Sequence, residues 1–344
     1  MYQLTKAIAS LLAVTVLAAP SPANDANPIP HTANGVIEVL KNNSFGNSKP
    51  LNEASLFERL NSDHFSSTNA NVAVSVHVGS DYEATPTFLG KQVGFSFKLP
   101  ARGTSVWKQP SGTRMLPIFF SHFRYTVPVP HTDGSVSISN ILLDQRAGNR
   151  IKILDTDSRL CNSKRQLTAL LAKSNCFVLA PAWAMDSNGR ILPSRYQEVG
   201  RKIFLKVDLS SPDIKYPIVT QALLGTQLID REAWIANPPF GPTLEIFPSY
   251  FGRMMGYLST YPLSPPQIGA LDVVSAGIAW YEVIAKATSR QKTLANSETM
   301  HVQFLCHYFF VSKAKATKRS WNLDLARPAR DLATAVRFQC NVPL

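Results

Sequence analysis

An alternation of apolar and polar side chains predicts β-strands through the first two thirds of the chain. Val72, Val74, Val76 and Val78 are separated by single residues, which is the period of a strand with one buried face. The same strand character recurs in five further segments, residues 93–99, 116–129, 136–143, 150–154 and 202–209. Short strands at near-regular intervals indicate an antiparallel sandwich or a barrel-like sheet.

Turn residues separate several of these strands. Asp133-Gly134 precedes the strand expected at 136–143, and Asn188-Gly189 precedes the apolar pair at 191–192. An Asn-Gly pair is typical of a two-residue hairpin turn in which both central residues take a positive φ. We therefore predict a tight hairpin centred on residues 188–189.

Helical periodicity is convincing in one segment, residues 269–286. The predicted apolar stripe consists of Leu271, Val274, Ile278, Tyr281, Ile284 and Ala285. Asp272 and Glu282 are expected to face away from it.

Outside this helix, the C-terminal third favours strands at 244–248 and 300–311, the second followed by a basic loop at 313–319. Near the N-terminus, residues 24–70 are rich in Asn, Ser, Pro and Ala and predict a flexible, mostly extended arm. A short helix is expected at 53–60 within it, and a folded pro-segment is the alternative interpretation of this stretch.

The first 23 residues have the features of a secretory signal peptide. Lys6 precedes an uncharged apolar run, residues 7–19, and small residues follow at 21–23. The run is shorter than the ~20 residues that a bilayer-spanning helix needs. We expect cleavage before Asn24, with Ala19 as the alternative start. The mature chain is then expected outside the cytoplasm, with no integral membrane segment.

The chain has 4 cysteines, which in an exported protein predict disulfides. Three connectivities are open, and proximity in sequence favours Cys161–Cys176 and Cys306–Cys340. A Cys/His metal site at Cys306-His307 is the alternative, but no CxxC spacing accompanies it. We therefore expect neither a metal nor another cofactor.

The net charge of +12 is concentrated near the C-terminus, because ten Lys or Arg residues face three acids between residues 286 and 337. Cations beside an exposed aromatic ring suit phosphate-bearing or uronate-bearing polymers, with the ring stacking on a sugar or base. The candidate binding residues are Lys313, Lys315, Lys318, Arg319, Trp321, Arg327 and Arg330. The alternative interpretation is a solvated basic surface with Trp321 in the core.

Evidence for catalysis is weaker. The sequence has no GxSxG, HExxH or Gly-rich phosphate-loop motif, so no catalytic residue is assigned. The candidates considered are a general base at His307, a calcium site at Asp155 and Asp157, and glycoside-hydrolysis pairs at Asp230/Glu232 and Glu245/Glu282. Each also has a structural interpretation, as a packed histidine, a polar turn or chance pairs of acids.

Three motifs stand out near the C-terminus, Trp321-Asn322-Leu323 followed by Asp324, Arg327-Pro328 and Cys340-Asn341. They resemble a family of secreted bacterial proteins known as domain of unknown function 2599. This chain departs from the family's pattern at Val342, which stands between Asn341 and the proline. Upstream, the run PAWAMDSNGRILPSRYQEVGRKIFLKVDLSS with the following YPIV resembles a segment of secreted actinobacterial proteins. The resemblance covers residues 176–344 and implies structural hallmarks rather than a chemistry.

Together these patterns predict an α+β protein in four parts. A signal peptide (1–23) and the arm (24–70) precede a β-rich antiparallel domain (71–225) and a small disulfide-stapled α+β domain (226–344). The expected function is non-enzymatic binding of an anionic wall polymer, membrane surface or partner through the basic C-terminal face. Nucleic acid is not the expected partner. An envelope-directed hydrolase and a bacteriocin-like effector are the alternatives.

Overall fold

The computed structural model describes residues 32–42, 103–109, 115–155, 159–160, 176–200, 202–225, 227–237, 239–259, 268–286, 297–312 and 318–343. It also describes the backbone of strands between residues 58 and 98. Contacts divide the chain into an N-terminal unit, residues 23–227 with 261–271, and a C-terminal unit, residues 228–260 with 272–344. The predicted signal peptide lies outside the described residues.

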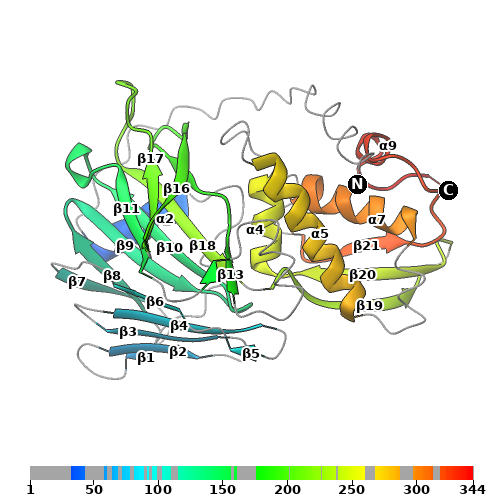
Figure 1. Ribbon diagram of the computed structural model, residues 1–344, viewed down its shortest axis with the longest axis horizontal. Helices are drawn as coiled ribbons and strands as arrows, with labels where there is room; N and C mark the ends of the chain where they lie inside the picture. Colours follow the sequence, from blue (N-terminus) through cyan, green and yellow to red (C-terminus); the bar gives the residue numbers. More distant parts are fainter. Residues whose placement is uncertain are drawn as a thin grey trace. The chain divides into compact units, whose positions relative to one another are not determined.

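The N-terminal unit is built mainly of antiparallel strand pairs, as the alternation predicted, although β12 and β13 pair in parallel (Figure 1). One sheet has the order β1-β2-β3-β4-β5, with β6 also pairing with β4. Its strands are β1 Glu58–Arg59, β2 His64–Thr68, β3 Val72–His77, β4 Asp81–Phe88, β5 Lys91–Gln92 and β6 Phe95–Lys98.

A larger sheet carries the core of this unit, in the order β12-β13-β18-β10-β9-β8-β7, with β14 joining β15 to β18. Its strands are β7 Gly103–Lys108, β8 Met115–Ser121, β9 Arg124–Pro130, β10 Val136–Leu142, β12 Arg159–Leu160, β13 Cys176–Leu179, β14 Trp183–Met185, β15 Ile191–Leu192 and β18 Ile218–Gly225. Strands β10 and β18 are buried along their whole length, so both faces of the sheet are covered there. A short 3-10 helix, η2, spans Gln145–Ala147.

A three-stranded sheet, β11-β17-β16, completes the unit. Its strands are β11 Arg150–Asp155, β16 Ser194–Val199 and β17 Lys202–Val207. Along β17, Ile203, Leu205 and Val207 are buried while the residues between them reach solvent, as the period of two predicted.

The hairpin at Asn188-Gly189 is confirmed, but its turn differs from the prediction. The Asp186 N–H donates to Arg190 O at 3.0 Å, and the Gly189 N–H donates to Asp186 O at 2.9 Å. The loop therefore has three residues, and positive φ falls on Gly189 alone, at 78°. A three-residue loop that ends in a left-handed glycine is the next commonest hairpin connection.

Residues 33–42 depart from the extended arm that the composition predicted, because they form helix α2 (Ala33–Asn42). Val36, Ile37, Val39 and Leu40 are buried on one side of it. The spacing of these four residues matches a helical turn, which explains why a stretch rich in small polar residues folds here. The short helix expected at 53–60 is contradicted at Glu58–Arg59, which is strand β1.

In the C-terminal unit, helices cover one face of a three-stranded antiparallel sheet, β19-β20-β21 (Figure 1). The elements are β19 Ile229–Ala236, β20 Pro242–Pro248, α4 Tyr250–Ser259, α5 Ile268–Lys286, α7 Glu298–Cys306, the π-helix η3 His307–Val311, β21 Trp321–Asp324 and α9 Leu332–Arg337. This confirms an α+β unit, and no described helix is both long enough and apolar enough to cross a membrane.

The strand predicted at 300–311 is wrong, since these residues form α7 and η3. The run is apolar and aromatic on nearly every side, so it shows no polar face from which a period could be read. Helix α7 begins at Ser297, whose side-chain oxygen accepts the Met300 N–H at 3.4 Å. Capping by serine therefore favours a helix where side-chain type alone suggested a strand.

Helix α5 confirms the prediction at 269–286, but its buried face is rotated from the expected one. Tyr281 is 47% exposed, whereas Glu282 is 4% exposed. A carboxylate expected in solvent therefore lies inside the unit.

Two glycines of α4 allow the backbone to approach its neighbours closely. A Cβ on Gly252 would lie 2.0 Å from Leu228 O, and one on Gly256 would lie 2.3 Å from Tyr308 O. Any larger residue would push α4 away from the start of β19 or from η3.

Candidate functional site

Trp321 belongs to the core of the C-terminal unit, which corrects its assignment as a surface stacking ring. Its side chain is 1% exposed. The ring lies edge-on to Phe304 and Tyr308, with centroid distances of 5.8 and 6.1 Å. Its role is therefore to anchor β21 against α7 and η3, the structural alternative for this residue.

Arg327 is also buried, in an ion pair rather than on a basic face. Its Nε donates to Asp324 Oδ2 at 2.6 Å, and its guanidinium lies 4.4 Å from the centre of the Phe240 ring. The same guanidinium donates to Val342 O, while Asp324 Oδ1 accepts the Thr243 hydroxyl at 2.6 Å. The pair thus ties the end of the chain to the sheet. It is unavailable to a ligand.

A side chain of α7 forms hydrogen bonds with the backbone of β21 at Asp324. Gln303 Nε2 donates to Asp324 O and Gln303 Oε1 accepts the Asp324 N–H, both at 2.9 Å. The amide group therefore occupies the place that the backbone of a neighbouring strand would take. Because both groups are buried, each bond also avoids an unsatisfied polar atom.

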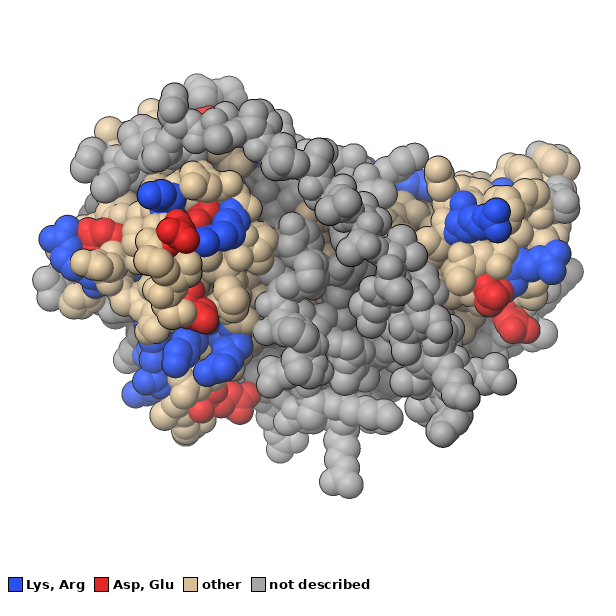
Figure 2. All heavy atoms as spheres, turned by 90° about the horizontal axis from the view of Figure 1, so that it is seen from above, with Lys and Arg blue, Asp and Glu red and all other residues tan. Residues whose placement is uncertain are grey.

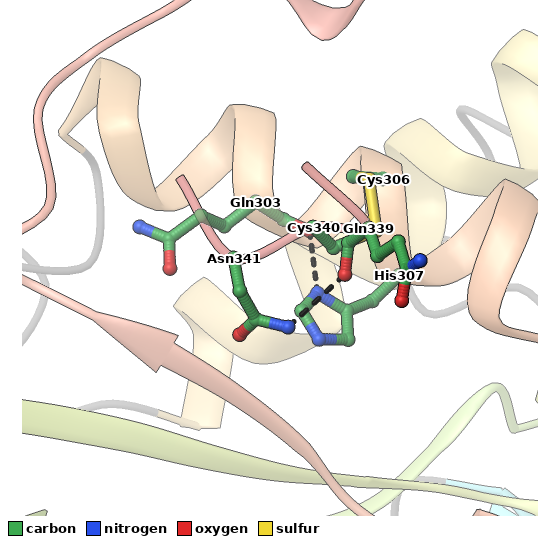
Figure 3. Close-up of a disulfide and its surroundings, with 6 residues drawn as sticks. All are labelled: Gln303, Cys306, His307, Gln339, Cys340 and Asn341. Atoms are coloured by element: carbon green, nitrogen blue, oxygen red, sulfur yellow. Dashed lines mark hydrogen bonds between the residues drawn. A yellow bond between two sulfur atoms is a disulfide. The ribbon is translucent and has the colours of Figure 1, made fainter. Parts of the chain in front are cut away.

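The disulfide between Cys306 and Cys340 is confirmed and joins the end of α7 to the segment after α9 (Figure 3). Gln339 and Cys340 both have positive φ, 51° and 67°, and the Cys340 N–H donates to Ala335 O at 2.8 Å. Cys161 lies outside the described residues, so its pairing with Cys176 stays a prediction.

His307, next to this disulfide, is 1% exposed and points into the unit. Its Nδ1 lies 2.8 Å from Gln303 O, which makes that nitrogen the donor (Figure 3). Burial lowers the pKa of His307 to about 4, although the Gln303 bond opposes the shift. His307 is therefore a neutral, buried histidine, which agrees with its structural interpretation and not with a general base.

The remaining predicted binding residues are only partly placed. Lys313 and Lys315 lie outside the described residues. Arg319 and Arg330 are exposed and Lys318 is half-buried, so these three are the described cations among the predicted binding residues that reach solvent. In Figure 2, clusters of described Lys and Arg side chains lie at the surface with acidic side chains beside them.

Three of the carboxylates considered for hydrolysis, Asp230, Glu232 and Glu282, lie near Lys286, an arrangement that the sequence did not predict. Glu282 Oε2 accepts the N–H groups of Leu228 and Ile229, at 3.0 and 2.9 Å. One turn further along α5, Lys286 Nζ donates to Ile229 O and Asp230 O. The charges of Asp230, Glu232 and Glu282 all act on Lys286.

Burial dominates the ionisation of this carboxylate–lysine cluster (Glu232, Glu282 and Lys286, with Asp230). It raises the pKa of Glu282 to about 7, against the opposing effect of the two backbone N–H groups and of Lys286. Burial likewise raises the pKa of Glu232 to about 7 and lowers that of Lys286. The cluster can therefore hold or release a proton near neutral pH. Glu245 is on β20, directly opposite Ala233 of β19, and is not part of this cluster.

No metal site is formed by the described residues, where no group of three or more His, Cys, Asp or Glu side chains could hold an ion. Of the proposed calcium ligands, Asp157 lies outside the described residues. Sequence reasoning missed the carboxylate–lysine cluster because Glu282 looks like a residue of the polar helix face. The available signal was an acid four residues before a lysine, Glu282 and Lys286, in an otherwise apolar stretch of helix.

Known proteins are similar to this chain over about a third of its length. Uncharacterized proteins of Mycobacterium bovis and of Mycobacterium tuberculosis strains H37Rv and CDC 1551 are each 30% identical to this chain over 115 residues. The match spans 33% of this chain and 66% of each relative. No solved structure matches the chain significantly. Residues 229–343, which contain the Trp321, Asp324–Arg327 and Cys306–Cys340 features, match the family described as "Protein of unknown function (DUF2599)".

Proposed function

We propose that the protein is exported and binds an anionic component of the cell envelope, without catalysis, through the basic segment of its C-terminal unit. The observation that carries the proposal is the solvent exposure of Arg319 and Arg330 and the partial exposure of Lys318, which precede and follow β21 in sequence. The excess of cations over acids in this part of the chain adds to it. An anionic polymer or headgroup layer is the complementary surface.

The disulfide and the Asp324–Arg327 pair support this function indirectly. The disulfide fixes the segment after α9, and the ion pair fixes the C-terminal end of β21 to the final residues, so Arg330 lies between two fixed points of the backbone. A preorganised surface loses less conformational entropy on binding than a mobile one.

The test is co-sedimentation of the mature protein with isolated wall and membrane fractions. We expect retention to fall with salt, because the Debye length shrinks from ~10 Å at 0.1 M to ~3 Å at 1 M. The variant K318E/R319E should lose retention, whereas the control K108E/K215E, with the same change in charge on exposed residues of the N-terminal unit, should keep it. Equal retention of both variants would contradict the proposal, and soluble fragments released from the wall would identify a hydrolase instead.

A further inference from the structure

A second basic surface lies on the N-terminal unit, on the three-stranded sheet β11-β17-β16. One side of this sheet is apolar and buried, through Ile151, Ile203 and Leu205. The other side reaches solvent, and two of its strands, β16 and β17, belong to the segment 181–211 that resembles part of secreted actinobacterial proteins. We call this side the basic sheet face; its described residues are Arg150, Lys152, Arg195, Gln197, Lys202, Phe204 and Lys206.

Strand register places three cations of this face in one row. Lys206 on the central strand β17 is directly opposite Arg150 on β11 and Arg195 on β16. Directly opposed residues of an antiparallel pair have Cβ atoms about 5 Å apart, and like charges in such pairs destabilise the sheet. Within the described part of the chain, none of the three forms a salt bridge. The three cations therefore repel one another, and a bound anion would relieve that repulsion.

One described acid, Asp208, lies directly after β17 and partly offsets the charge of the row. Its carboxylate accepts the Ser210 N–H at 3.0 Å. The hydrogen bonds from Ser210 chiefly lower its pKa, and the charges of Lys206 and Arg195 add to that effect. Lys152 and Lys202 lie in the two following rows, and Asp155 of β11 is directly opposite Lys202. Cations thus remain in excess on the face.

Arg150 is held flat against the sheet. Its guanidinium carbon lies 3.8 Å from the centre of the Phe204 ring, in the adjacent row. Stacking on a ring leaves the N–H groups at the edge of the guanidinium available, and their fork matches the oxygens of a phosphate. Arg150 is therefore oriented for an anion before any ligand arrives.

We infer that the basic sheet face binds a linear phosphate polymer. Adjacent strands are about 4.8 Å apart, so the three cations span about 10 Å across the sheet, which suits a chain with regularly repeated charges better than one small anion. Single-stranded nucleic acid would require an open aromatic face for its bases. On this sheet the Phe204 ring is already covered by Arg150, so the phosphates alone are recognised.

Fluorescence anisotropy with labelled long-chain inorganic polyphosphate tests the inference on the full mature chain. K206E should weaken binding about tenfold or more, because the new carboxylate occupies Arg150 and Arg195. A plot of the logarithm of the association constant against the logarithm of the salt concentration should then become less steep, its slope decreasing in magnitude by about two. K206Q should have a smaller effect. The control K215E, an exposed lysine of the same unit with the same change in charge, should leave affinity within about twofold.

Two measurements separate this inference from misfolding and from the proposed function. K206E should melt at or above the wild-type temperature, because it places an acid between two arginines. Equal weakening by K206E and K215E would overturn the inference, as would loss of polyphosphate binding in K318E/R319E alone. Tighter binding of phosphatidylglycerol vesicles or of single-stranded DNA than of polyphosphate would also overturn it. The envelope-retention test of the C-terminal segment can succeed or fail independently.

Discussion

Replacing Glu282 by glutamine tests whether a buried, protonatable carboxylate controls the stability of the C-terminal unit. Glutamine is nearly isosteric, and its carbonyl oxygen can accept both N–H groups that Glu282 Oε2 accepts from Leu228 and Ile229. The substitution therefore keeps the hydrogen bonds while removing the titration.

The expected magnitude follows from the pKa of Glu282, which burial raises from 4.5 to about 7. Between these values the folded protein holds a proton that the unfolded chain has released. Stability is therefore fully present below pH 4.5 and is lost as the pH rises through 7. At ~1.4 kcal/mol for each pH unit, the loss amounts to about 3 kcal/mol.

Urea unfolding of wild type and E282Q, followed by tryptophan fluorescence from about pH 4.5 to about pH 8, measures this effect. Wild type should lose about 3 kcal/mol relative to E282Q over that range. Wild type is compared with E282Q because His307 also makes stability depend on pH in both proteins. Burial lowers the pKa of His307 to about 4, so its contribution lowers stability as the pH falls below 6.5. A difference between the two proteins that stays constant with pH would refute the reasoning, as would a Glu282 carboxyl that titrates near 4.5 by NMR.

Three further predictions concern the framework of the same unit. C340S should lower the free energy of unfolding by roughly 2–5 kcal/mol, measured against wild type by urea unfolding with and without reductant; equal stability would show that the disulfide is dispensable. R327A should cost about 3–5 kcal/mol because it leaves Asp324 buried without its partner, and R327A/D324N should recover part of the loss. G256A should lower the thermal midpoint, since its Cβ would lie 2.3 Å from Tyr308 O; an unchanged midpoint would mean that α4 moves freely.

Strand β17 of the N-terminal unit could be predicted because one of its faces is buried and the period of two survives in the sequence. The alternation around Ile203 and Leu205 located β17 within two residues. The same alternation placed Lys206 on the other face, but register with Arg150 and Arg195 depends on which strands become neighbours. Arg150 and Lys206 are 56 positions apart in the sequence, and no local pattern shows that their strands pair, so the basic row could not be predicted.

In the C-terminal unit, prediction failed where side chains are buried on every side. Residues 300–311 carry aromatic and apolar groups all round, so strand propensity and helical packing could not be separated. Arg327 and Asp324 looked like surface charges because nothing local shows that they pair in the interior. The resemblance to a known family correctly treated these motifs as structural hallmarks, and the Cys306–Cys340 pairing followed from proximity in sequence.

The bond between Gln303 and β21 has a consequence for association between molecules. In the described residues β21 is the outer strand of its sheet, and an outer strand is a template on which another chain can add. Gln303 occupies both backbone groups of Asp324, so this end of the edge offers no partner to a foreign strand. A Q303L variant would release them, and light scattering on gentle heating should detect self-association that wild type resists.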